Sequence, residues 1–234
     1  MSNSSWIEIY TSPDGQTFSG YLSLPPTGSG PALVILQEIW GVNDHIQAVA
    51  DQYAADGYVV LAPDVYWRQQ YRTNLTYDQS GTDQARQLMM ALDRDQATED
   101  LMLALEYLRQ QATVTGPVGV VGFCMGGQLA FRLAANSTVD AAVCYYGGGI
   151  EQQLHLADDI RAPILFHHAS LDSMISQDAV NNIRTAMASH QGSVFFDYLD
   201  TDHGFNCWGR PMYNQQASAL AHGRTLQFLA EQLV

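Results

Sequence analysis

Val118-Gly119-Val120-Val121-Gly122-Phe123-Cys124-Met125-Gly126-Gly127-Gln128-Leu129-Ala130 is the stretch that decides the fold of this chain. Its first half is an apolar, valine-rich run, which predicts a buried parallel strand. Glycines then surround Cys124, and residues 128–135 predict the opening of a helix. A strand that turns straight into a helix strains and crowds its central residue, and glycine neighbours relieve that crowding. The stretch therefore predicts a tight strand–turn–helix unit with Cys124 at its tip.

The pattern Gly122-x-Cys124-x-Gly126 has the form of a nucleophile elbow, with cysteine in the place of the usual serine. The N-terminus of the following helix offers N–H groups and the positive end of a dipole, and both favour a thiolate or an oxyanion. The alternative is a buried structural cysteine in a glycine-rich turn, because free cysteine is among the most buried residue types. Residues further along the chain favour the first interpretation.

Composition argues against several classes of function. The chain has 234 residues, which is enough for one α/β domain with a large core. Its formal net charge is −14, and all 10 basic residues are arginines. Such acidity argues against partners that attract basic patches, namely nucleic acid and anionic membranes. No internal repeat, low-complexity tract or linker is visible, so residues 1–234 are predicted to form a single domain.

The N-terminal residues and the cysteines suggest a compartment. The sequence before Trp6 has neither a basic nor an apolar segment, so no signal peptide is expected, and no apolar run approaches membrane-spanning length. The three cysteines, Cys124, Cys144 and Cys207, are odd in number and widely spaced, which fits neither a disulfide framework nor a zinc site. These features predict a cytoplasmic protein with no metal or cofactor, in which a reactive thiol stays reduced.

Hydrophobic patterns along the rest of the chain predict alternating strands and helices. Strands are expected at 6–10, 17–24, 32–36, 58–62, 141–146, 163–168 and 193–198, in addition to the run that begins at 118. Helices are expected at 44–55, 83–92, 96–111, 128–135, 176–189 and 214–233. Asp14-Gly15 predicts a hairpin, Asp44 a helix cap and Gly57 a helix stop. Residues 65–82 are expected to form a loop over the strand ends. The alternation predicts an α/β fold with a mostly parallel sheet and helices on both faces.

Candidate catalytic side chains follow the predicted strands, and their order along the chain is informative. In an open parallel sheet, functional groups gather at the carboxyl ends of the strands. Cys124 follows one predicted strand, Asp172 follows the strand that ends at His168, and His203 follows the last strand. The order nucleophile, acid, base is that of the α/β hydrolases. His203 would take the thiol proton and later protonate the leaving group, while Asp172 would hold the imidazole in the correct tautomer.

Other residues are open to plainer interpretations. Three aspartates rival Asp172 as partners of the histidine: Asp178, Asp200 and Asp202. The last two are too near the histidine in sequence for the usual architecture, so we expect them to be loop residues. His167 and His168 are expected to pack or to hydrogen-bond near the site. The remaining histidines, His45, His155, His190 and His222, are expected at surface or helix positions. Cys144 is expected in a core strand, and Cys207 either lines the pocket or fills a loop.

At this point the sequence resembles the dienelactone hydrolase family of α/β hydrolases over nearly its whole length. The stretches that carry the resemblance are Gln37-Glu38-Ile39-Trp40-Gly41-Val42-Asn43, Ala62-Pro63-Asp64-Val65-Tyr66, Gly122-Phe123-Cys124-Met125-Gly126-Gly127, Tyr145-Tyr146-Gly147, and His203 with Phe205. A cysteine elbow together with the first of these stretches is far more specific than either alone.

The resemblance implies an activity and roles for residues. It implies that Cys124, His203 and Asp172 form a triad that hydrolyses an enol-lactone or related ester through an acyl-enzyme. It further implies that Glu38 contacts the resting thiol and moves away when substrate binds. The two backbone N–H groups of the oxyanion hole would belong to Ile39 and Met125, since such donors suit a developing negative charge.

The resemblance is weaker where the substrate is recognised. Dienelactone enzymes of this family hold a substrate carboxylate with two arginines, and the matching positions here are Thr82 and Cys207. Arg86 and Arg210 lie nearby in sequence and are candidate replacements, although each could equally be a surface residue. The aromatic residues Tyr145 and Trp40 are further candidates for substrate contacts.

The leading hypothesis is therefore a cofactor-free hydrolase of small lactones or esters, acting on a small molecule and favoured to be a monomer. A second hypothesis is a general carboxylesterase or thioesterase. A third is a redox-sensing or ligand-binding protein on the same fold, because fold does not fix function.

Overall fold

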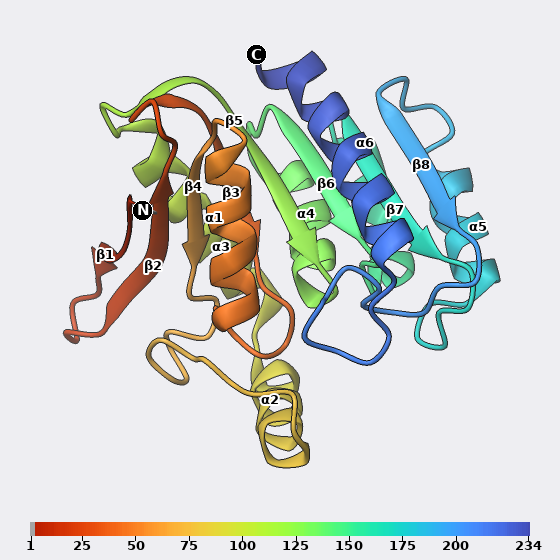
Figure 1. Cartoon of the computed structure of the whole chain (residues 1–234), viewed down its shortest axis with the longest axis horizontal. Helices are drawn as coiled ribbons and strands as arrows, with labels where there is room; N and C mark the ends of the chain where they lie inside the picture. The colour runs from red at the N-terminus through yellow and green to blue at the C-terminus, as the bar shows by residue number, and fades with distance from the viewer. Residues whose placement is uncertain (1–2) are drawn as a thin grey trace. The chain divides into compact units, whose positions relative to one another are not determined.

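The computed structural model describes residues 3–234, which cluster into two compact units (Figure 1). The first unit extends to Gly119 and the second begins at Val120, so the boundary falls within strand β5 (Val114–Phe123). The prediction of a single domain over residues 1–234 stays a prediction, and its first two residues lie outside the described part.

The first unit is built from four further strands and three helices. The strands are β1 (Asn3–Thr11), β2 (Thr17–Leu24), β3 (Gly30–Leu36) and β4 (Val59–Pro63). The helices are α1 (Asp44–Ala55), α2 (Gln79–Ala91) and α3 (Arg94–Arg109). The strands lie in the order β1-β2-β4-β3, with β3 and β4 parallel and the other pairs antiparallel.

The first two strands form the hairpin that the sequence predicts. Their register runs from Asn3 opposite Leu24 to Thr11 opposite Thr17, and the connecting turn places Gly15 at φ +85°. A residue with a side chain rarely adopts that conformation, which explains the glycine. Strand β4 is buried along its whole length, as a continuous apolar run predicts.

Helix α1 has the predicted extent but a different cap. The side chain of Asn43 accepts a hydrogen bond from the backbone N–H of Ile46, so Asn43 is the cap and Asp44 is the first helical residue. Gly57 follows the helix at φ +109° and ends it, as predicted. His45 lies within α1, which agrees with the expected surface or helix position, and it is buried on the inner face of that helix.

Helix α2 begins four residues earlier than the sequence predicts. Asp78 caps it, accepting a hydrogen bond of 2.8 Å from the backbone N–H of Gly81. Only Gly81 and Ala85 of this helix are buried, so little apolar periodicity marks its first turn. Residues 79–82 are therefore helix, and the predicted loop ends before them.

The second unit contains the end of β5, three more strands and three helices. The strands are β6 (Ala141–Tyr145), β7 (Ile164–Ala169) and β8 (Ser193–Tyr198). The helices are α4 (Met125–Asn136), α5 (Gln177–Ala186) and α6 (Gln215–Leu233), with two short 3₁₀ segments at Ile150–Gln152 and Leu154–Asp159. Helix α4 begins directly after Cys124, three residues before the predicted start.

The strands of the second unit place the reactive residues at one edge. They lie in the order β5-β6-β7-β8, and the β6–β7 and β7–β8 pairs are parallel. Figure 1 shows α6 in front of these strands and α4 and α5 behind them. Cys124 follows β5, Asp172 lies in the loop after β7, and His203 lies in the loop after β8. The predicted α/β fold with mostly parallel strands and helices on both faces is confirmed.

Candidate active site

The turn between β5 and α4 has the strained geometry that the sequence predicts. Cys124 lies at φ 55° and ψ −117°, a conformation that residues with side chains rarely adopt. A Cβ atom added to Gly122 would lie 1.9 Å from the carbonyl oxygen of Gly126, so no larger residue fits there. The backbone N–H of Cys124 donates to the carbonyl of Tyr145 at 3.0 Å. The turn therefore holds the sulfur at the N-terminus of α4, above the end of β6.

The structure brings together the three residues that the sequence assigns to a triad. The Nε2 atom of His203 lies 3.0 Å from the sulfur of Cys124. Its Nδ1 atom lies 2.8 Å from Oδ2 of Asp172. All three side chains are buried. A nucleophile next to a base, which is in turn oriented by an acid, is the arrangement that nucleophilic catalysis requires.

The loop after β7 fixes the orientation of Asp172. Its Oδ1 atom accepts the backbone N–H groups of Met174 at 2.8 Å and Ile175 at 3.0 Å, which leaves Oδ2 directed at His203. Two rivals are accounted for elsewhere. Asp202 accepts the backbone N–H of His203, and Asp200 lies in an exposed turn at φ 55°. Asp172 is thus the carboxylate that meets the imidazole.

The charges around His203 favour its protonated form. Burial alone would lower the pKa of His203, but the negative charges of Cys124 and Asp172, together with hydrogen bonds to both, raise the pKa to about 10. An imidazolium beside the sulfur stabilises a thiolate. The geometry therefore places a protonated His203 within hydrogen-bond distance of the Cys124 sulfur.

Tyr146 is a site residue that the sequence analysis did not select. It directly follows β6 at φ 36°, and its backbone N–H donates to the carbonyl of His167. Its ring packs edge-on against the His203 ring, with 5.1 Å between the centroids. This contact restricts the tilt of the imidazole. The only signal in the sequence is its place beside Tyr145 in the stretch Tyr145-Tyr146-Gly147.

Tyr145 belongs to a buried polar network between β6, β7, β8 and α6. Its hydroxyl lies 2.7 Å from Oγ1 of Thr225, which also lies 2.9 Å from Nε2 of His167. The Nδ1 atom of His167 lies 2.8 Å from the hydroxyl of Tyr198. Burial, with the charges of His168 and Arg224, holds the pKa of His167 well below its usual range. The ring is therefore neutral and hydrogen-bonded, whereas a substrate contact by Tyr145 stays a prediction.

The other cysteines and His168 are interior residues. Cys144 lies in β6, where burial raises the pKa of its thiol well above the usual range. Cys207 is fully buried in the loop after His203. The ring of His168 stacks on Phe166 and Phe195, and burial lowers its pKa to about 4. Cys144 and His168 are therefore neutral at pH 7, as an interior position favours.

Three further predicted site residues, Glu38, Ile39 and Trp40, follow β3 in the first unit. Glu38 and Ile39 are buried in the segment that follows β3. Trp40 is buried too, and its indole N–H donates to the hydroxyl of Thr82 at 3.3 Å. Its ring meets that of Tyr77 edge-on at 5.0 Å. The catalytic role of Glu38, the oxyanion role of Ile39 and the substrate contact of Trp40 stay predictions.

The two candidate arginines lie in different settings. Arg86 projects from α2 with 61% of its side chain exposed, and its Nη1 lies 3.8 Å from Oδ1 of Asp83 one turn earlier. Arg210 lies in the second unit, where its guanidinium packs against Gly204, the residue after His203. A Cβ atom at Gly204 would lie 2.3 Å from Nη1 of Arg210. Of the two, Arg210 is the better placed to influence the loop of His203.

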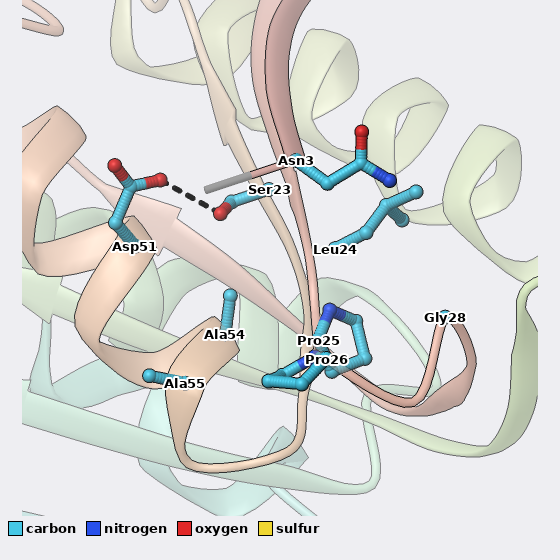
Figure 2. A pocket seen from close by; sticks show the side chains of 9 residues that line it. All are labelled: Asn3, Ser23, Leu24, Pro25, Pro26, Gly28, Asp51, Ala54 and Ala55. Atoms are coloured by element: carbon cyan, nitrogen blue, oxygen red, sulfur yellow. Dashed lines mark hydrogen bonds between the residues drawn. The ribbon is translucent and has the colours of Figure 1, made fainter. Parts of the chain in front are cut away.

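A cavity of about 480 Å³ lies elsewhere in the first unit, between the end of β2 and the last turns of α1 (Figure 2). Figure 2 shows Asp51 and Ser23 hydrogen-bonded to each other at one end, and Pro25 and Pro26 at the other. Asp51 also accepts the hydroxyl hydrogen of Ser4 at 2.6 Å. None of the residues that the sequence selects for catalysis lines this cavity.

Two further properties concern ligands and membranes. Within residues 3–234, no cluster of three or more histidine, cysteine or acidic side chains has a geometry suited to a metal ion. Of the helices in that part of the chain, none combines the length and the apolarity needed to cross a membrane.

Comparison with known sequences identifies a family. The model of the family described as the dienelactone hydrolase family matches residues 18–233. Carboxymethylenebutenolidase 1 of Cupriavidus pinatubonensis is 35% identical over 228 residues, which cover 96% of this chain and 95% of that protein. This similarity extends over both units.

Solved structures give the same result for the fold. A structure assigned as a dienelactone hydrolase, from Klebsiella pneumoniae subsp. pneumoniae MGH 78578, has a TM-score of 0.87 at 25% identity and covers 98% of this chain and 99% of its own. The alpha/beta hydrolase GrgF from Penicillium sp. sh18 has a TM-score of 0.68 at 15% identity and covers 98% of each chain. The latter likeness concerns the fold alone.

Proposed function

The chain belongs to the dienelactone hydrolase family and is a carboxylic ester hydrolase, and from that premise we propose that it cleaves small lactones or esters through a thioester on Cys124. The observation that carries the proposal is the alignment of Cys124, His203 and Asp172, with 3.0 Å and 2.8 Å between successive partners. Burying a thiol, an imidazole and a carboxylate costs free energy. The stability of the fold does not require this arrangement, which favours a catalytic reason for it.

Acylation follows from the geometry of the pair. The thiolate of Cys124 attacks the carbonyl carbon, a C–S bond forms, and the carbonyl π electrons move to the oxygen. The resulting oxyanion needs N–H donors. Met125 opens α4 and can supply one at the positive end of the helix dipole. The other, by resemblance, is Ile39. When the intermediate collapses, the C–O bond breaks and Nε2 of His203 gives its proton to the leaving oxygen.

Deacylation reverses the roles. The now neutral His203 accepts a proton from water, and the hydroxide oxygen bonds to the thioester carbon. Collapse of this second intermediate releases the carboxylic acid, and the sulfur leaves as thiolate. Asp172 stabilises the imidazolium each time it forms, without accepting its proton. Water is consumed, and no cofactor takes part in the proposed cycle.

Substrate recognition is proposed to differ from that of enzymes with two carboxylate-binding arginines. Thr82 is bonded to Trp40, and Cys207 is buried, so neither position offers a positive charge. We therefore propose a small lactone or ester whose acid portion is held by Arg210 or is uncharged. A cytoplasmic location and a monomeric state fit a reactive thiol and remain part of the proposal.

Turnover of p-nitrophenyl acetate tests the proposed function. We expect a burst of p-nitrophenol followed by a slower steady state, because acylation precedes deacylation. Cys124→Ala should lose both phases, whereas Cys144→Ala should keep both. Mass spectrometry of the quenched wild type should show one acetyl group on Cys124. Turnover that survives Cys124→Ala would refute the thioester route, and no turnover of any lactone, ester or thioester would favour a ligand-binding or redox-sensing role.

A further inference from the structure

A buried carboxylate organises the segment after β4. Asp64 is fully buried, and its backbone N–H donates to the carbonyl of Ser19 in β2 at 2.9 Å. Its Oδ2 atom accepts the backbone N–H of Arg72 at 2.6 Å, and its Oδ1 atom accepts that of Tyr66 at 3.3 Å. The backbone N–H of Thr73 also donates to the carboxylate. One side chain thus accepts hydrogen bonds from residues near both ends of the loop of residues 65–75.

The same loop is tied to the end of β3 by a buried amide. The backbone N–H of Val65, the residue after Asp64, donates to Oε1 of Gln37 at 3.2 Å. Gln37 is fully buried and directly precedes Glu38. The orientation of the chain at Glu38 therefore depends on where Val65 lies.

The far end of the loop is tied to the same segment. The backbone N–H of Leu75 donates to the carbonyl of Trp40 at 3.0 Å, and Gly41 forms an isolated antiparallel bridge with Asn74. A Cβ atom at Gly41 would lie 2.1 Å from the carbonyl oxygen of Thr73, so the two backbones touch. The segment from Glu38 to Gly41 is held from both sides by residues that Asp64 organises.

The charge on Asp64 is costly and has little compensation. Burial raises the pKa of Asp64 to about 7, although hydrogen bonds from Arg72, Tyr66 and Thr73 and the charge of Arg72 oppose that rise. Arg72 supplies the charge that opposes this rise. The Ser19 carbonyl and the Gln37 amide oxygen, from β2 and the end of β3, are neutral and accept the backbone N–H groups of Asp64 and Val65. A neutral residue would be cheaper to bury, but only an ionised carboxylate accepts several N–H groups on both oxygens at once.

We propose that Asp64 is a positioning residue for the reaction: its carboxylate holds the 65–75 loop against Trp40 and Gly41, and thereby fixes Glu38 and the backbone of Ile39 at the end of β3. The link to catalysis rests on the proposed function, in which the N–H of Ile39 stabilises the oxyanion, and on the predicted contact of Glu38 with the thiol. Asp64 itself does not touch the reacting atoms.

Asp64→Asn tests the proposal, with Asp51→Asn as the matched control. Both are aspartates of the first unit that accept several hydrogen bonds, but Asp51 accepts them from the hydroxyls of Ser4 and Ser23 and lies away from the loop. At pH 8.5 we expect Asp64→Asn to lower kcat of ester turnover about tenfold with little change in KM, because a transition-state donor is displaced. Asp51→Asn should keep kcat within about twofold, and Gln37→Met should behave like Asp64→Asn.

The pH profile separates positioning from mere stability. In the wild type, kcat/KM should fall as the pH drops through about 7, where Asp64 takes up a proton. Asp64→Asn should lack this step and stay low at every pH. Its melting temperature at pH 8.5 should not fall, because a buried charge has been removed. A loss of activity that follows only a loss of stability, with the step intact, would overturn the proposal.

Amide hydrogen exchange gives a readout that needs no activity. Exchange at Arg72 and Leu75, corrected for the intrinsic rate, should rise about tenfold in Asp64→Asn and not in Asp51→Asn. If Asp64→Asn does not fold, Gln37→Met serves in its place: exchange at Val65, whose N–H donates to Gln37, should rise about tenfold while kcat falls. Unchanged protection rejects the positioning role. If ester turnover survives Cys124→Ala, the thioester route is refuted. Faster exchange in Asp64→Asn would even then support the contact between Asp64 and the loop.

Discussion

The ends of β5 and β3 both deliver residues of the proposed site, yet they are built differently. The turn after β5 is determined by its own sequence, because Gly122 makes room for Cys124 and α4 begins at once. The segment after β3 has no such local device. It is held by Val65, Thr73 and Leu75, which come 24 or more residues after Gly41 in the sequence.

The two parts of the proposed site are thus encoded in different ways, one in local and one in distant sequence. A strained turn that supports a nucleophile must not move during the reaction, and neighbouring glycines and a helix are enough to fix it. A segment that carries an acid and an N–H donor gains its position from long-range hydrogen bonds, which can loosen independently of the turn. Changes near β5 should therefore affect the triad itself, whereas changes near β3 should affect it only through Glu38 and Ile39.

Asp172→Asn carries the largest expected effect, because it acts directly on the proposed triad. An amide at this position keeps the shape but favours the wrong tautomer of His203, so kcat should fall about 10³-fold. The measurement is steady-state hydrolysis of p-nitrophenyl acetate. Asp178→Asn is the control, since that residue lies in the first turn of α5, and should stay within about twofold. Equal losses in the two variants would remove Asp172 from the triad.

Two glycine substitutions should separate the two strand ends. Gly122→Ala places a Cβ atom 1.9 Å from a backbone oxygen, and Gly41→Ala places one at 2.1 Å and at φ +83°. Each should lower the free energy of unfolding by more than about 2 kcal/mol in urea denaturation. Gly122→Ala should also abolish iodoacetamide labelling of Cys124, whereas Gly41→Ala should preserve it. Gly223→Ala, with open space around it in α6, should instead stabilise the protein by about 0.5–1 kcal/mol.

The same contrast explains what the sequence could predict. Cys124, Asp172 and His203 could be selected because each follows a strand and the strands are strongly apolar. The predicted start of helix α2 is four residues late because the helix is largely exposed, and its capping signal is a single side chain, Asp78. Asp64 and Gln37 could not be assigned their contacts at all. Their partners are backbone N–H groups, which nearly every residue type has, so the sequence does not mark them.

Lowering the pH should reduce the free energy of unfolding through His168 in the second unit and increase it through Asp64 in the first. The pKa of His168 is about 4 in the folded protein and near 6.5 when unfolded, so the unfolded state binds more protons between these values. The free energy of unfolding should therefore fall as the pH drops from 6.5 to 4, by up to about 1.4 kcal/mol per pH unit from this residue. Asp64 has the opposite sign between pH 7 and 3.8, because the folded state binds the extra proton.

Urea denaturation at several pH values checks these signs. His168→Phe, which continues the stack of Phe166 and Phe195, should reduce the dependence on pH below 6.5, although buried His167 still contributes to it. Asp64→Asn should increase that dependence, since it removes the opposing group. The quantity to compare is the slope of the free energy of unfolding against pH, because the substitutions also change its absolute value through packing. A wild-type slope that neither variant alters would contradict the assignment.

The arginines should show a smaller effect that depends on substrate charge. Arg210→Ala should raise KM about tenfold for an anionic ester and leave KM for a neutral ester unchanged, because one ionic contact is lost. Arg86→Ala should change neither, since its side chain is mostly exposed and paired with Asp83. Equal changes for both esters in Arg210→Ala would indicate that the residue supports the loop through Gly204 and binds no carboxylate.

The smallest expected effect concerns the guard that Glu38 is predicted to place on the thiol. A carboxylate near Cys124 disfavours the thiolate, so Glu38→Gln should speed alkylation of this residue by iodoacetamide about fivefold at pH 7. Ester turnover should fall at the same time if Glu38 takes part in the substrate-triggered proton transfer. Glu106→Gln is the control, because that residue is exposed on α3 and bonded to Gln110.

The labelling must be read at Cys124 alone, and the composition of the chain allows this. Because the sequence contains no lysine, trypsin cleaves only after arginine, and Cys124 lies on the peptide between Arg109 and Arg132. Cys144 and Cys207 fall on later peptides, so their labelling is counted separately. Unchanged alkylation together with unchanged turnover in Glu38→Gln would make Glu38 an ordinary buried carboxylate. The positioning role of Asp64 would then concern the backbone of Ile39, and the loss of kcat in Asp64→Asn should persist in the Glu38→Gln background.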